Sequence, residues 1–246
     1  MSKFSKALFE EQLKYAAWYL GAVLVFQLVY FGLAIYYESD VGNFLAFVIA
    51  PTRVFMLIIG ITSAYGLLTY YAKLGKTRKV YFKKNLVAVG LLAVTIALIA
   101  GVVTFIQHVV ANVMGWSHLL QYTMSGTHIQ SPNGSLNLDL TGMAESGSGL
   151  NFDESLLLSF AAFIIQLVVF YLIGWFVGAG YYRYGWLIGF LFVAAALIFI
   201  GSLQWIWSGR VIEAGSLIVS TGATVMLGLF VGYLTWKVLS KTPIKL

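Results

Sequence analysis

The feature that most constrains this chain is a series of six long runs that are almost free of charged residues. About 20 apolar residues, at about 1.5 Å of rise each, are enough to cross the hydrocarbon core of a membrane as a helix. The runs predict an all-α integral membrane fold with six transmembrane helices. Only Arg53 interrupts them, and they cover residues 15–37, 43–72, 85–114, 155–182, 184–209 and 214–236.

The composition excludes a soluble globular protein. Charged residues make up 10% of the chain, against about 25% in an average soluble domain. The sequence contains no cysteine, which excludes disulfides, thiolate metal ligands and a cysteine nucleophile.

The charged residues separate into two sets when they are placed on the six helices. One side would hold 13 basic and 2 acidic residues, and the other side 2 basic and 7 acidic residues. Lys and Arg concentrate on the cytoplasmic side of membrane proteins. The net charge of +6 is therefore interpreted as an orientation signal rather than a nucleic-acid-binding surface, and both termini are predicted to be cytoplasmic.

Residues 1–246 are predicted to form one transmembrane domain with two distinctive segments. Residues 2–14 place apolar side chains on one helical face and are predicted to form an amphipathic helix on the inner leaflet; a frayed, charged tail is the alternative. Residues 114–154 form the large extracellular loop. Within it, an alternating pattern after a Ser-Pro-Asn-Gly turn predicts a β-hairpin that pairs 127–130 with 136–140.

Catalytic motifs are absent from the sequence. The three histidines, His108, His118 and His128, do not have the spacing of a metal site. Gly75-Lys76-Thr77 matches the end of a phosphate-binding loop, but position 70, which should be glycine, is tyrosine. We therefore expect neither an enzyme nor a bound metal in this chain.

Arg53 is the one charged residue that the pattern places inside a helix, near its outer end. A buried arginine needs a partner, while an arginine near a helix end can extend its head group to the membrane surface. Both interpretations stay open. An outer gate or ion-pair group would combine Arg53 with charged residues of the same side: Glu38, Asp40, Arg210 and Glu213.

Pairs of small residues four positions apart predict close helix packing. The pairs are Gly174 with Gly178 and Gly228 with Gly232. Small residues allow two helix backbones to approach closely in a membrane. The pattern does not decide between packing within one chain and packing between subunits.

Segment 73–84, KLGKTRKVYFKK, is the most informative cytoplasmic segment. It has six basic residues, no acidic residue and interleaved aromatic residues. Thr77 can cap a short helix that would present Val80, Tyr81 and Phe82 to a cytoplasmic partner. A solvated loop that only sets orientation is the alternative, and nucleic-acid binding is the weakest interpretation.

Two stretches resemble the ABC-2-type permease subunits of bacterial ABC transporters, especially compact Gram-positive permeases that export peptides and drugs. The stretch YAKLGKTRKVYFKKN at 71–85 is similar to their segment between helices two and three. The stretch LIGWFVGAGYYRYG at 172–185 is similar to their Gly-rich turn between helices four and five. With the N-terminal helix and the six-helix plan, the resemblance covers nearly the whole chain.

The resemblance implies a permease subunit of an ATP-driven exporter in the bacterial plasma membrane. Such a chain would pair with a second permease subunit, identical or different, and carry a hydrophobic or amphipathic peptide or drug, as phenol-soluble modulin exporters do. ATP and Mg would be bound by separate cytoplasmic ATPase subunits. Residues 2–14 would be the connecting helix and 73–84 the coupling helix. Its contact candidates are Lys73, Gly75, Lys76, Thr77, Arg78, Lys79, Tyr81 and Phe82.

Two other functions remain open from the sequence. A membrane sensor or assembly subunit that transports nothing could share this topology. A membrane enzyme that uses the outer-side histidines is the less favoured alternative.

Overall fold

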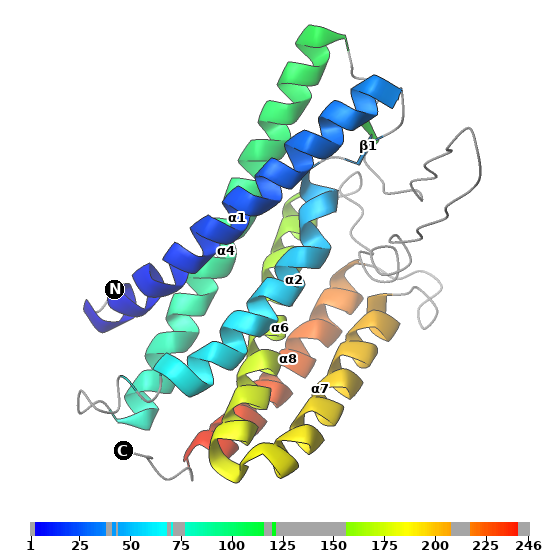
Figure 1. Cartoon of the computed structure of the whole chain (residues 1–246). Coiled ribbons are helices and arrows are strands. Elements are labelled where there is room, and N and C mark those ends of the chain that lie inside the picture. Colours follow the sequence, from blue (N-terminus) through cyan, green and yellow to red (C-terminus); the bar gives the residue numbers. More distant parts are fainter. Residues whose placement is uncertain are drawn as a thin grey trace.

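The computed structural model describes residues 3–37, 41–42, 44–67, 70, 77–115, 120–121, 156–207 and 217–240. These residues are almost entirely helical (Figure 1). In chain order the elements are α1 (Lys3–Tyr37), β1 (Val41–Gly42), α2 (Phe44–Thr62), the π-helix η1 (Ser63–Leu67), α4 (Arg78–Met114), β2 (Leu120–Gln121), α6 (Leu156–Tyr184), α7 (Trp186–Trp207) and α8 (Leu217–Ser240).

Six helices are long and apolar enough to cross a membrane: α1, α2 continued by η1, α4, α6, α7 and α8. The predicted six-helix fold is confirmed at this level, and the chain has the character of a multi-pass membrane protein. A helix is suited to this environment because it satisfies the backbone hydrogen bonds within the segment.

Successive helices run in opposite directions, so the start of α1 and the end of α8 lie at the same end of the bundle (Figure 1). The start of α4 and the junction of α6 with α7 lie there too. We call this the basic end, because most of the described basic residues gather at it: Lys6, Lys14, Arg78, Lys79, Lys83, Lys84, Arg183 and Lys237.

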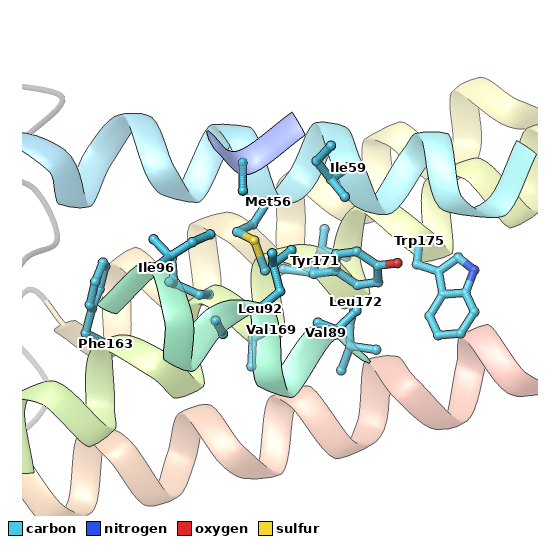
Figure 2. Close-up of a cluster of buried hydrophobic side chains, with 14 of the residues drawn as sticks. Met56, Ile59, Val89, Leu92, Ile96, Phe163, Val169, Tyr171, Leu172 and Trp175 are labelled. Atoms are coloured by element: carbon cyan, nitrogen blue, oxygen red, sulfur yellow. The ribbon is translucent and has the colours of Figure 1, made fainter. Parts of the chain in front are cut away.

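Helix α6 lies at the centre of the bundle and packs against α2, α4, α7 and α8. Every residue from 171 to 180 is buried. Figure 2 shows side chains of α6 meeting Met56 and Ile59 of α2 and Leu92 of α4 in one apolar cluster. The hydrophobic core is therefore built around α6.

Helices α2 and α6 approach each other at glycines. A Cβ atom on Gly60 would overlap the backbone carbonyl oxygen of Tyr171, and one on Gly174 would overlap that of Leu57. A Cβ atom on Gly178 would lie 2.6 Å from the backbone carbonyl oxygen of Ile61, one turn further along α2. Only residues without a side chain fit at this crossing, so Gly174 and Gly178 serve packing within the chain.

The second predicted glycine pair lies at the contact between α8 and α6. A Cβ atom on Gly228 would be 2.7 Å from the side chain of Val169, and one on Gly232 would be 3.7 Å from Leu172. The approach is tight at the first glycine and ordinary at the second.

Helix α1 runs without a break from Lys3 to Tyr37. Ser5, Leu8, Gln12 and Ala16 repeat at helical spacing and are all buried, because this part of α1 packs on α4. Residues 3–14 therefore form the first part of α1, and the face with Ser5, Leu8 and Gln12 meets protein; the position of residues 2–14 on the inner leaflet stays a prediction.

The opposite end of the bundle is described only in part. Two residues of β1 pair in parallel with two residues of β2, with Val41 opposite Leu120. The predicted hairpin of 127–130 with 136–140, and most of the 114–154 loop, lie outside the described residues. At the basic end, Gly185 joins α6 to α7 with a φ of 83°, a left-handed conformation that glycine adopts without strain.

Candidate functional site

The described part of segment 73–84 begins at Thr77 and forms the start of α4. Thr77 has extended backbone angles, φ −72° and ψ 147°, and its hydroxyl accepts a hydrogen bond from the backbone N–H of Val80 at 3.4 Å. Threonine is a preferred residue at this position because it satisfies an otherwise free helix N–H. The predicted helix start at Thr77 is confirmed, although the helix is the long α4 rather than a short one. Three contact candidates, Lys73, Gly75 and Lys76, lie outside the described residues.

Tyr81 points into the bundle instead of presenting its ring to a partner. It is 1% exposed, and its hydroxyl donates to the backbone oxygen of Ser63 at 2.9 Å. The same hydroxyl lies 2.7 Å from the Ser63 hydroxyl. The prediction that Tyr81 is a docking residue is therefore wrong, because the helix phase directs it toward η1.

Phe82 also faces the protein. Its ring stacks on that of Trp175 with centroids 4.9 Å apart and lies 5.2 Å from the ring of Trp236. The start of α4 is thus held against α6 and α8, and Phe82 is not presented for docking. Thr77, Lys79 and Val80 are the exposed residues of this turn.

One helical turn after Tyr81, a buried network of polar side chains joins α1, η1, α4 and α6. The amide nitrogen of Asn85 in α4 donates to the Tyr171 hydroxyl of α6 at 2.8 Å and to the Ser63 hydroxyl of η1 at 3.2 Å. Gln12 of α1 donates to Asn85 at 3.0 Å and to Tyr171 at 3.1 Å. Sequence reasoning missed this network. The signal was a polar residue, Asn85, one helical turn after Tyr81 on a stripe that continues with apolar residues.

Two arginines, one in the stretch 71–85 and one in the stretch 172–185, bind the end of α8. Arg78 donates to the backbone oxygen of Ser240 at 3.2 Å, and Arg183 donates to that of Val238 at 3.1 Å. The last carbonyl groups of a helix have no partner within the helix and carry partial negative charge. Arg78 therefore has a structural partner in the chain, in addition to any role as a contact residue.

Arg53 lies nine residues after the start of α2, about 13 Å along the helix axis. This agrees with the run predicted from residue 43, which placed Arg53 inside the helix. Its guanidinium donates to the side-chain oxygen of Gln166 in α6 at 2.6 Å and lies 5.8 Å from the ring centre of Phe170. Among the described residues, Arg53 is the only Asp, Glu, Lys or Arg outside the parts of the helices near the basic end.

A small gap beside Arg53 is lined by residues of α2, α6 and α7. It holds about 10 Å³ for the centres of water-sized atoms, which is close to the minimum for one water molecule. Its walls are Arg53, Gln166, Phe170, Leu203, Gln204 and Trp207.

The partners predicted for an outer gate cannot be placed beside Arg53. Glu38, Asp40, Arg210 and Glu213 lie outside the described residues. The same is true of His118 and His128, while His108 is a partly buried residue of α4. Within the described part of the chain, no three His, Cys, Asp or Glu residues gather as a metal site would require.

No family model, curated protein or solved structure matches this chain. The permease family suggested by the two stretches is therefore a proposal, which depends on the residues themselves and on their geometry.

Proposed function

We propose that this chain is the permease subunit of an ATP-driven exporter in a bacterial plasma membrane, with both termini cytoplasmic. It would pair with a second permease subunit and form the path for a hydrophobic or amphipathic substrate. Separate cytoplasmic ATPase subunits would bind ATP and Mg. Six apolar helices support the membrane setting, and the stretches 71–85 and 172–185 support the family.

One observation carries the proposal: the first turn of α4 is fastened to three other parts of the bundle. Tyr81 bonds to Ser63 of η1, Phe82 stacks on Trp175 of α6, and Arg78 bonds to the end of α8. A partner that pushes on the preceding loop would therefore move η1, α6 and α8 together with α4. This is the mechanical property that a coupling segment needs.

The local structure of η1 fits a moving element. A single turn of π-helix is uncommon and occurs frequently at functional sites, and η1 ends α2 directly beside Tyr81. The contact surface for an ATPase would be the exposed side of the turn, with Thr77, Lys79, Val80 and Lys83. Tyr81 and Phe82 then transmit the movement and do not contact the partner.

The first test uses charge reversal on this surface. The double variant Lys79→Glu/Lys83→Glu is expected to lose most of the ATPase that co-purifies with the tagged full chain from its own membrane. Lys237→Glu is the matched control, because Lys237 is an exposed basic residue of the same end on another helix. If both variants retain the same amount of ATPase, or if the wild-type chain retains none, the proposed coupling surface is wrong.

The second test separates an exporter from a sensor or assembly subunit. The purified complex is placed in proteoliposomes and the uptake of fluorescent amphipathic peptides is followed with and without ATP. An exporter shows ATP-dependent flux that falls in Phe82→Ala while the ATPase stays bound. A complex that hydrolyses ATP without any flux would favour the sensor.

A further inference from the structure

The gap beside Arg53 is a second place where the chain carries polar chemistry at membrane depth. Three helices supply its walls: α2 provides Arg53, α6 provides Gln166 and Phe170, and α7 provides Leu203, Gln204 and Trp207. Charged groups inside membrane helices are costly and mark pathways or ligand sites. The gap lies away from the basic end and from the coupling segment.

Gln166 makes this gap a donor-rich site. The residue is 1% exposed, and its side-chain oxygen already accepts a hydrogen bond from Arg53. Its side-chain nitrogen is buried and has no hydrogen-bond partner among the described residues. Leaving a buried N–H group unsatisfied costs about 1–3 kcal/mol, so a group in the gap that accepts a hydrogen bond from it would remove this cost.

The rest of the wall selects what can carry that group. Phe170, Leu203 and Trp207 present apolar surface to the gap. The indole N–H of Trp207 is already used, because it donates to the Thr224 hydroxyl of α8 at 3.0 Å. An acceptor attached to an apolar body matches these surroundings, whereas a fully polar ion does not.

The positive charge of Arg53 favours an anionic hydrogen-bond acceptor over a neutral one. Arg53 and Gln166 both line one small space, and the guanidinium supplies a positive charge beside it. Hydrogen bonds from arginine to a carboxylate or phosphate oxygen are about twice as strong as bonds between neutral groups. The space of about 10 Å³ admits one oxygen atom, so one oxygen of the head group enters the gap and the rest of the ligand lies outside it.

We propose that the gap formed by Arg53 and Gln166 binds the negatively charged head of an amphiphile, a carboxylate or a phosphate on an apolar chain. The apolar chain lies along α7 on the side of Gln204, which is exposed. The inference concerns binding alone and holds whether or not the chain is an exporter.

The test measures binding to the purified full chain in a neutral detergent by native mass spectrometry. The probes are dodecanoate, dodecyl phosphate and dodecyltrimethylammonium, which share a chain length and differ in the head group. The wild-type chain is expected to retain at least one of the two anions and not the cation. The two anionic arms distinguish a carboxylate from a phosphate ligand.

Two variants remove the site in different ways. Arg53→Gln removes the cation and is expected to weaken anion binding at least tenfold. Gln166→Glu supplies a carboxylate beside Arg53 from the chain itself, so it is expected to preserve folding and to exclude the added anion to a similar degree. Gln107→Glu is the matched control, because its oxygen can still accept the bond from the backbone N–H of Phe44 and it should bind like the wild type.

Three results would overturn the proposal. Equal retention of the cation would show that the apolar chain alone drives binding. Equal retention of the anions by the wild type, Arg53→Gln and Gln166→Glu would show that they bind elsewhere. Failure of the wild type to retain either anion would leave the gap as a site for a resident water molecule only.

Discussion

Removal of a single oxygen atom tests how firmly the start of α4 is fastened to the bundle. Tyr81→Phe keeps the ring against Trp175, where the centroids are 6.0 Å apart, and deletes only the hydroxyl. Two interactions with Ser63 are lost, at 2.9 and 2.7 Å. No cavity of the size that follows a large-to-small substitution is created, so the change in stability reports the hydrogen bonds.

The expected loss of unfolding free energy follows from the number of hydrogen bonds removed and from their position between membrane helices. Hydrogen bonds between membrane helices contribute about 0.6 kcal/mol on average and up to about 1.7 kcal/mol. The loss of two such bonds is expected to lower the free energy of unfolding by about 1–3 kcal/mol, a factor of about 5–150 in the unfolding equilibrium constant. Tyr81→Ala should cost more, since it also empties a fully buried volume.

The assay is reversible unfolding of the full chain in bicelles with SDS, followed by tryptophan fluorescence. Trp175 lies beside Tyr81 and reports the local change. Tyr233→Phe is the control, because Tyr233 is 60% exposed on α8 and should show wild-type stability. If both phenylalanine variants unfold like the wild type, the Tyr81 hydroxyl does not hold α4 to η1, and α4 cannot move η1 through it.

Two further substitutions probe the packing of the bundle. Gly174→Ala is expected to lower the free energy of unfolding by at least about 1–3 kcal/mol, because the new Cβ atom would overlap the backbone oxygen of Leu57. Gly222→Ala, which meets nothing within 4 Å, should be neutral or stabilising in the same assay. Trp207→Phe loses the bond to Thr224, about 0.6 kcal/mol, and also part of a buried ring, so its total cost should exceed that figure. In a double-mutant cycle with Thr224→Val, the two losses should not add; additive losses would show that the bond contributes nothing.

The existence and order of the six helices followed from the sequence because the rule behind them is local. A stretch of apolar residues in a membrane must satisfy its backbone within itself, and a helix does so. The continuity of α1 and α4 did not follow. The spanning runs were predicted to begin at residues 15 and 85, after an amphipathic helix at 2–14 and a short helix near Thr77. Instead, α1 and α4 run without a break from Lys3 and Arg78. The long side chains of the charged residues there extend outward at the basic end while the opposite face is buried.

The contents of the candidate sites were predicted less well, because they depend on helix phase and on neighbours far apart in sequence. The cap at Thr77 needs only the next three residues and was predicted. The inward direction of Tyr81 depends on where η1 lies. The bond between Arg53 and Gln166 joins residues 113 positions apart, and nothing in the spacing of either residue indicates the other.

The central claim is that this chain transmits the action of an ATPase through the first turn of α4. The most direct measurement is the ATP hydrolysis rate of the co-purified ATPase in proteoliposomes, with the wild-type chain and with Lys79→Glu/Lys83→Glu and Phe82→Ala. The account predicts hydrolysis that is stimulated by amphipathic peptide in the wild type, lost with the bound ATPase in the charge-reversed variant, and uncoupled from peptide in Phe82→Ala. An ATPase whose rate and peptide response are the same with all three chains would contradict it.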